Sequence, residues 1–166
     1  MNKIFNRFTM SSNIDIKPGF MDLKNPEELG YLFDDFFEYT LTCLDAAEDA
    51  DDFSLMMADQ AHLLASGFTS NSKVLVVDDD PSGEKLAARL RNSLYNDGLL
   101  PKDSPVMLMA QPQEFVFMAA VLMSRQFMEM IRDCSEKNLS DEVIDLRRQA
   151  LVKDWVDRFL GKGKYA

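Results

Sequence analysis

The sequence predicts a mainly α-helical, single-domain bundle built around one central helix. Three features of the 166-residue chain favour this fold class: apolar residues recur at helical spacing, capping residues mark several helix starts, and no internal repeat or long linker divides the chain. A chain of about 150 residues buries roughly 70% of its unfolded surface, so one core suffices without disulfides or metal. We expect a single globular domain over residues 21–166, preceded by a tail or extension at residues 1–20.

The N-terminal segment leaves three interpretations open. Met1, Ile4, Phe5 and Phe8 would share one helical face, with basic residues nearby. Such a stretch fits a packed strand or helix, a targeting or membrane-surface segment, or an upstream extension in which Met10 is the true start. We favour the packed element, because one short basic amphipathic stretch is weak evidence for a targeting or membrane-surface segment.

The first helix of the domain is expected over residues 26–47. Asn25 can cap it, the following proline suits its first turn, and the next acids complement the helix dipole. An apolar stripe then follows at helical spacing, formed by Leu29, Leu32, Phe33, Phe36, Phe37, Leu41 and Leu44. After a polar break at residues 48–52, whose last acids can cap the next element, a second helix is expected over about 52–65, with Gly67 after its end.

The segment 73–110 carries the β signal of the chain. Residues 73–78 contain three β-branched side chains and fit a short buried strand. A helix over 81–96, started and capped by Asp80 and its neighbours, is expected to follow. Residues 105–110 fit either a second strand or a short helix. If both are strands, the segment is a small βαβ unit, which makes an α+β fold the alternative.

The predicted central helix spans residues 113–132. The run from Phe115 to Met123 comprises nine consecutive apolar residues, and neither Gly nor Pro interrupts the helix. Because the helix is apolar almost all round at its start, it must be covered on several sides, and we expect Phe117 and Leu122 to be buried. A bilayer span needs about 20 consecutive apolar residues, so no transmembrane segment is expected.

A last helix is expected to begin after its cap Ser140 and to end at Gly161. This helix is the expected electrostatic counterpart of helix 26–47, within the chain or between chains. Its basic residues are Arg147, Arg148, Lys153 and Arg158.

The acidity of the chain is concentrated in one segment. The net charge is −10, and the residues from Asp15 to Gln60 contain 13 acids and two lysines. Direct nucleic-acid binding is disfavoured, because neutralising phosphates needs a basic surface. The acids serve either solubility or an encounter with a basic partner. Methionines are also frequent in the helices, and some of this surplus apolar surface is expected to meet another protein.

Residues 73–81, Lys-Val-Leu-Val-Val-Asp-Asp-Asp-Pro, are similar to the opening strand and acidic pocket of bacterial response-regulator receiver domains. Residues 104–110 resemble the fourth strand of that family. The resemblance implies a magnesium role for Asp78 and Asp79. It covers barely a quarter of the chain, however, and too few residues separate the two stretches to hold the intervening strands and the phospho-accepting Asp. We therefore interpret the segment as a strand followed by acids that cap a helix.

Metal-binding and catalytic patterns are incomplete. The acids from Asp78 onward partly match a calcium loop, but Arg89 stands where a Glu should close it. His62, Cys43 and Cys134 give at most three zinc ligands, with no close pair. We expect a structural or surface histidine, buried reduced thiols, and neither a metal nor a cofactor.

The predicted function is that of a non-enzymatic, acidic protein–protein interaction module, such as an adaptor, a chaperone-like binder or an inhibitor. Its partner would be a protein with a basic surface, bound through Asp34, Asp35, Glu38 and Asp45. The alternative is a metal-dependent enzyme or switch centred on the cluster Asp78–Asp80. The expected localisation is cytoplasmic, since no secretory segment is recognised. The sequence leaves open who the partner is and whether copies of the chain associate.

Overall fold

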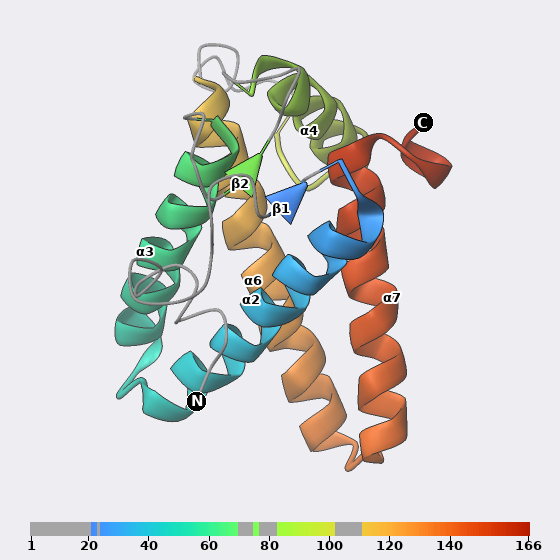
Figure 1. Ribbon diagram of the computed structural model, residues 1–166. Helices are drawn as coiled ribbons and strands as arrows, with labels where there is room; N and C mark the ends of the chain where they lie inside the picture. The colour runs from blue at the N-terminus through green and yellow to red at the C-terminus, as the bar shows by residue number, and fades with distance from the viewer. Residues whose placement is uncertain (1–20, 23, 70–74, 77–82, 102–110) are drawn as a thin grey trace.

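The computed structural model describes residues 21–22, 24–69, 75–76, 83–101 and 111–166. Over these residues the chain is mainly α-helical, which confirms the predicted fold class (Figure 1). The predicted tail at residues 1–20 lies outside the described residues. The helices are α2 (Pro26–Ala46), α3 (Ala50–Thr69), α4 (Glu84–Asn96), α6 (Pro112–Glu136), α7 (Asp141–Leu160) and the 3₁₀ helix η2 (Gly163–Tyr165).

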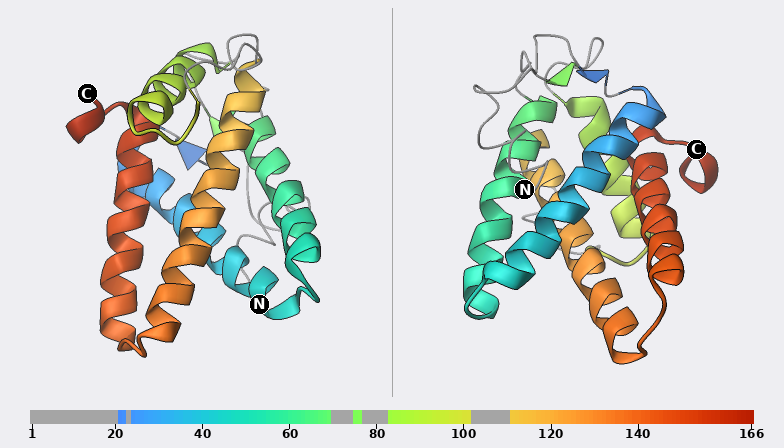
Figure 2. Two further views of the ribbon diagram at one scale, coloured as in Figure 1. Left: turned by 180° about the vertical axis from the view of Figure 1, so that it is seen from behind. Right: turned by 60° about the horizontal axis from the view of Figure 1, so that its bottom comes forward.

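Helix α6 is the central helix, as predicted, and extends beyond the expected range at both ends. It packs against α2, α3, α4 and α7, and the view from behind shows it between α3 and α7 (Figure 2). The expected burial is wrong for Phe117 and Leu122, because both pack only at the edge of the core and are half-buried there. The Phe117 ring stacks on the exposed His62. The buried face of α6 consists instead of Phe115, Val116, Ala119, Ala120, Met123 and Phe127.

Helix α2 confirms the prediction for residues 26–47. The side chain of Asn25 accepts a hydrogen bond from the backbone N–H of Glu27 (2.9 Å), as a capping residue should. The apolar stripe packs mainly against α7 and α6. Phe33 meets Phe159 edge-on, with ring centroids 4.9 Å apart, so the hydrophobic face of α2 is fixed by aromatic contacts in the core.

Helix α3 is longer than predicted. It begins at Ala50 and continues through Gly67 to Thr69, so the expected end before Gly67 is wrong. A glycine inside a helix costs about 1 kcal/mol relative to alanine. Here the next residue, Phe68, is 2% exposed and lies 5.2 Å from the Phe159 ring, between centroids, so core packing outweighs that cost.

The βαβ alternative is not supported. Strand β2 (Leu75–Val76) falls within the expected strand, but it pairs in parallel with β1 (Met21–Asp22), a partner that precedes α2. Residues 105–110, the expected second strand, lie outside the described residues. Helix α4 begins at Glu84 after Gly83, which has φ +76° and makes no side-chain capping bond, so the expected start at residue 81 is wrong.

Helix α7 begins and ends as predicted. The Oγ atom of Ser140 accepts a hydrogen bond from the backbone N–H of Val143 (3.3 Å), and Gly161 ends the helix with φ +65°. A Cβ atom at Gly161 would lie 2.8 Å from Cδ of Arg89, whose Nε donates to the Phe159 carbonyl (2.9 Å). A positive φ and close packing therefore both require glycine at this end of the helix.

None of the described helices combines the length and the apolar character needed to cross a bilayer.

Candidate functional site

Helices α2 and α3 form a hairpin that carries charge of one sign. Residues 26–69 contain eleven Asp and Glu residues and neither Lys nor Arg. The last turn of α2 has no basic residue, so the negative end of its dipole is not compensated there. The two helices meet at one corner of the bundle, where the end of α2 turns into the start of α3 (Figure 1). The negative charge of the hairpin is densest at this turn.

The acidic corner, as we name it, consists of Asp45, Glu48, Asp49, Asp51 and Asp52. Two of its carboxylates fix the turn: Asp49 Oδ1 accepts from the N–H of Asp52 (2.8 Å), and Asp52 Oδ2 accepts from the N–H of Glu48 (3.0 Å). Asp49 thus caps α3, whereas the last acids of the polar break, which were expected to cap it, lie in its first turn. All five residues are exposed or half-buried, and none forms an ion pair with a basic residue of the described part of the chain.

The predicted partner-binding residues occupy different environments. Asp45 is exposed and Glu38 is half-buried, and both lie on the outer face of α2. Asp34 is half-buried, and one of its oxygens is 3.6 Å from Nε of Arg148 on α7. Asp35 is 5% exposed and faces the interior, because it lies about 100° around the helix from Asp34. Glu38 and Asp45 are therefore accessible to a partner, whereas Asp35 is not.

Helix α7 neutralises the hairpin only in part. Of the four basic residues expected to face helix 26–47, Arg148 alone pairs with α2. Arg147 binds Asp133 (2.6 Å), and this hydrogen bond holds the pKa of the Asp133 carboxyl below its usual value. Lys153 pairs with Asp157, and Arg158 pairs with Asp97 and Asp154. Most acids of the hairpin consequently form no ion pair with a basic residue of the described part of the chain.

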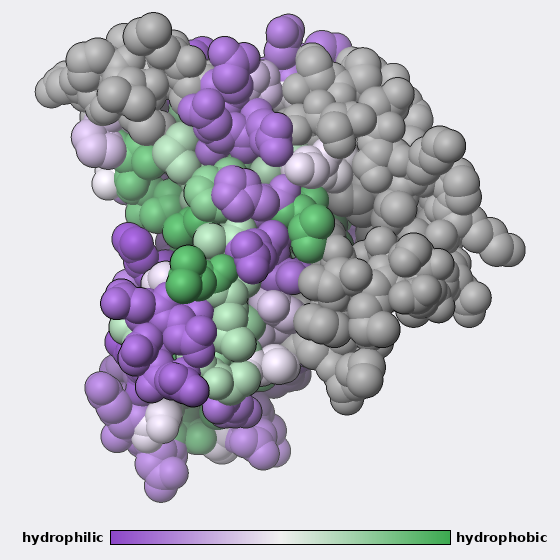
Figure 3. Space-filling model, turned by 90° about the vertical axis from the view of Figure 1, so that its left-hand side faces the viewer, coloured by the Kyte–Doolittle hydropathy of each residue, from purple (hydrophilic) through white to green (hydrophobic). Residues whose placement is uncertain are grey.

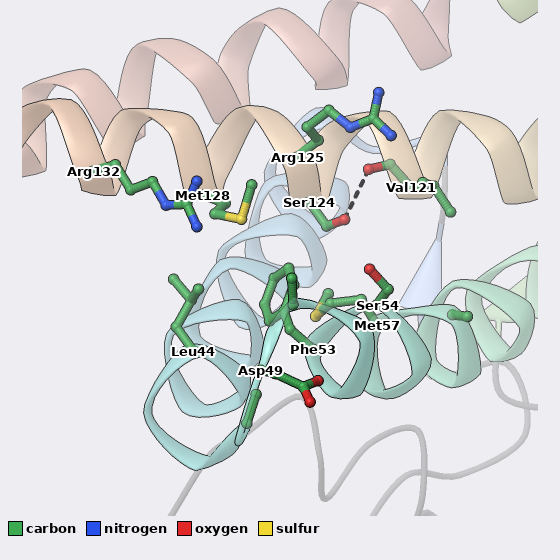
Figure 4. A pocket seen from close by; sticks show the side chains of 13 residues that line it. Leu44, Asp49, Phe53, Ser54, Met57, Val121, Ser124, Arg125, Met128 and Arg132 are labelled. Carbon is green, nitrogen blue, oxygen red and sulfur yellow. Dashed lines mark hydrogen bonds between the residues drawn. The ribbon is translucent and has the colours of Figure 1, made fainter.

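A pocket of about 390 Å³ opens beside the acidic corner, and we name it the corner pocket. Its walls come from the end of α2, the start of α3 and the middle of α6. In Figure 4, Phe53 and Met57 rise from α3 toward α6, while Met128 lies on the α6 side of the gap. Pockets that bind ligands commonly measure about 300–1,000 Å³. The lining residues are Leu44, Ala47, Asp49, Ala50, Phe53, Ser54, Met57, Ala58, Val121, Ser124, Arg125, Met128 and Arg132.

The α3 side of the molecule is rich in apolar surface. Figure 3 shows apolar residues gathered in a band across this face, bordered by hydrophilic residues. On α3, Leu55 is 69% exposed and Leu63 is 39% exposed. Apolar side chains beside charged ones are typical of surfaces that other proteins bind.

Two ionisable side chains of α2 are held in their protonated form. Burial raises the pKa of the Cys43 thiol and of the Tyr39 phenol, so both groups keep their protons at neutral pH. The hydroxyl of Ser124 donates to the carbonyl oxygen of Val121 (2.8 Å). Within the described ranges, no group of three or more His, Cys, Asp and Glu residues is placed to hold a metal ion. The alternative cluster Asp78–Asp80 lies outside those ranges.

Comparisons with protein-family models, with curated proteins and with solved structures found no match to this chain.

The corner pocket was not identified from the sequence, because three separate helices form it. The available signal was the surplus of large apolar residues on helices 26–47 and 113–132, part of which was expected to meet another protein. Leu44 and Met128 come from these two helices and line the pocket together. The sequence thus indicated the helices, and only the fold brings their side chains together.

Proposed function

We propose that this protein is a non-enzymatic interaction module that binds a basic surface of a partner protein through its acidic corner. One observation carries the proposal: the α2–α3 hairpin holds eleven acids and neither Lys nor Arg, and its corner acids form no ion pair with the described basic residues. Like charges held this close repel one another and destabilise the fold. A basic partner relieves that repulsion, so the same charges favour its encounter and binding.

The proposed contact surface differs from the one that the sequence indicated. It keeps Glu38 and Asp45 and adds the other acids of the acidic corner. It omits Asp35, which is buried, and places Asp34 at the margin, because Arg148 lies against it. The apolar lining of the adjacent pocket supports a protein partner, since protein interfaces combine an apolar centre with a charged rim.

Matched charge reversals test the proposal. One variant carries Glu38, Asp45, Glu48 and Asp51 changed to Lys. The control carries Glu114, Glu129, Glu136 and Glu142 changed to Lys, all of them exposed. Both sets change the net charge from −10 to −2. The sets also match locally: Asp51 and Glu142 occupy the second position of their helices, and Asp45 and Glu136 lie in last turns.

Cooperative thermal melts first confirm that each variant folds. The partners that the parent protein captures are then identified, and the amount that each variant captures is quantified. We expect the corner reversal to lower capture at least tenfold, because opposing charges across an interface become like charges. The control reversal should capture nearly as much as the parent. Equal loss of capture in both variants would mean that capture depends on net charge and not on the acidic corner. Unchanged capture by the corner variant would overturn the proposal.

A further inference from the structure

The corner pocket has rims of opposite charge. Asp49 stands on the α2–α3 rim, next to the other acids of the acidic corner. Arg125 and Arg132 line the pocket from α6; both are exposed, and neither forms an ion pair with an acid of the described residues. In Figure 4 the Arg125 side chain lies on the side of α6 that faces away from α3, so Arg132 supplies the positive flank. In Figure 4, Arg132 extends under α6 on the side of Leu44. An occupant of the pocket therefore meets negative charge on one flank and positive charge on the other.

We propose that the corner pocket takes one large apolar side chain from an amphipathic helix of the basic partner, with Lys or Arg of that helix facing the acidic corner and a carboxylate facing Arg132. This inference rests on the proposed function and adds the position and orientation of the partner. A uniformly basic helix would meet repulsion at Arg132, so the charge pattern selects partners as well as attracting them.

The lining of the pocket suits such an anchor. Phe53 and Met57 approach from α3 and Met128 from α6, so the anchor would touch apolar atoms on two walls. Methionine side chains are unbranched and adapt to the shape of what they contact. Amphipathic helices commonly bind grooves through such anchors, and a few central apolar residues supply most of the binding energy.

A second copy of this chain fits the pocket less well. Two-fold interfaces bring the same surface of each subunit together. A dimer centred on this pocket brings two acidic corners together; Arg125 and Arg132 of each copy are outnumbered by the five acids of the acidic corner, and each copy carries a net charge of −10, so the two copies repel. The charge pattern favours a different, basic protein.

A synthetic Ala-rich helical peptide of about 15 residues serves as the probe. It carries a central Phe, Lys residues along one flank and one Glu on the other. Binding to the full chain is measured by fluorescence anisotropy. Ser54 lines the pocket and is exposed, so Ser54→Trp fills the pocket without entering the core. The control is Leu146→Trp on α7, which is 66% exposed and outside the lining.

We expect Ser54→Trp to weaken binding at least tenfold, as for the loss of one anchor residue, and Leu146→Trp to leave binding within about twofold of the parent. Replacing the Phe of the peptide by Ala should weaken binding to the parent by a similar factor. Changing Arg132 to Gln and the Glu of the peptide to Gln should show coupling in a double-mutant cycle. Absence of binding by the parent, or equal binding by Ser54→Trp, overturns the proposal.

Methionine-methyl NMR locates the peptide independently. We expect the signals of Met57 and Met128 to shift on addition of the peptide, while that of Met123, which is 0% exposed in the core, stays in place. Concentration-dependent shifts without peptide would assign the pocket to a second copy. Shifts caused by Phe5→Ala with Phe8→Ala would assign it to the chain's own N-terminal segment, and either result overturns the proposal.

The two proposals fail in different ways. If the corner reversal abolishes peptide binding and Ser54→Trp does not, the acidic corner keeps its proposed function and the pocket loses its occupant. If Ser54→Trp weakens binding of the peptide and the corner reversal has no effect on it, the pocket binds apolar side chains, and the proposed function of the acids is wrong.

Discussion

Arg158 shows how a buried charge holds the C-terminus of the chain. It is 3% exposed and pairs with Asp97 (2.7 Å) and Asp154 (3.3 Å). It also donates to the hydroxyl of Tyr165 (2.6 Å), which in turn donates to Asp154 (2.7 Å). The guanidinium lies over the rings of Trp155 and Tyr165, at 4.9 and 4.4 Å from the centroids. These contacts join η2 to α7, and a buried charge of this kind is costly once a partner is removed.

This network predicts a specific loss of stability in acid. Burial raises the pKa of Asp154, but the hydrogen bond from Tyr165 and the charge of Arg158 outweigh burial, so its pKa lies below the usual value. Because the folded-state pKa is depressed, Asp154 stabilises the fold above the unfolded value of about 3.9, and this stabilisation disappears as the pH falls through the folded value. Asp154→Asn should therefore be less stable than the parent at about pH 6. Its free energy of unfolding should fall less than that of the parent when the pH is lowered to about 3.

Urea unfolding at both pH values measures this difference. Asp59→Asn is the control, since Asp59 is exposed on α3 and forms no ion pair with the described residues. The control should follow the pH dependence of the parent. A parent-like pH dependence in Asp154→Asn would show that the carboxylate contributes nothing specific to the folded state.

At the scale of elements, α6 has an inner and an outer side that its sequence does not distinguish. Phe127 is 0% exposed and meets Phe37 edge-on at 5.0 Å between centroids. Phe117 is half-buried and stacks on His62 at the surface. We predict that Phe127→Ala lowers the free energy of unfolding by about 3–5 kcal/mol. Phe117→Ala should cost clearly less, because it removes less buried area and leaves no enclosed cavity.

Urea denaturation of the two variants, in the same buffer as the parent, decides the ranking. Equal losses would mean that both phenylalanines belong to the core and that the exposed side of α6 is covered by something else.

Helix ends were predictable where the signal is local. Asn25 and Ser140 cap α2 and α7, and Gly161 ends α7, because capping side chains and a glycine at positive φ act within a few residues. The end of α3 was mispredicted, because Phe68 packs on Phe159, about 90 residues further along the chain. Likewise, β2 pairs with β1 rather than with a later strand, and such a long-range choice leaves no mark on the segment itself.

At the scale of the whole molecule, the sequence predicted the acidic region, and the fold decides which of its acids are accessible. The burial of Asp35 and the contact of Asp34 with Arg148 depend on how α2 packs against its neighbours. The concentration of acids at the α2–α3 turn was visible in the sequence, but the adjacent pocket needs α6 as its third wall. The charge was therefore predictable from the sequence, whereas the shape of the site was not.

The central claim is that the acidic corner guides a basic partner onto this protein, and the salt dependence of the association rate constant tests it most directly. The partner captured by the parent is mixed with it in stopped flow between about 0.05 M and 0.5 M ionic strength, over which screening shortens the range of the charges several-fold. We predict that the rate constant falls about tenfold or more for the parent. For a variant with Asp45, Glu48 and Asp51 changed to Asn, Gln and Asn it should fall much less. Parallel salt dependences for the two proteins would contradict the claim.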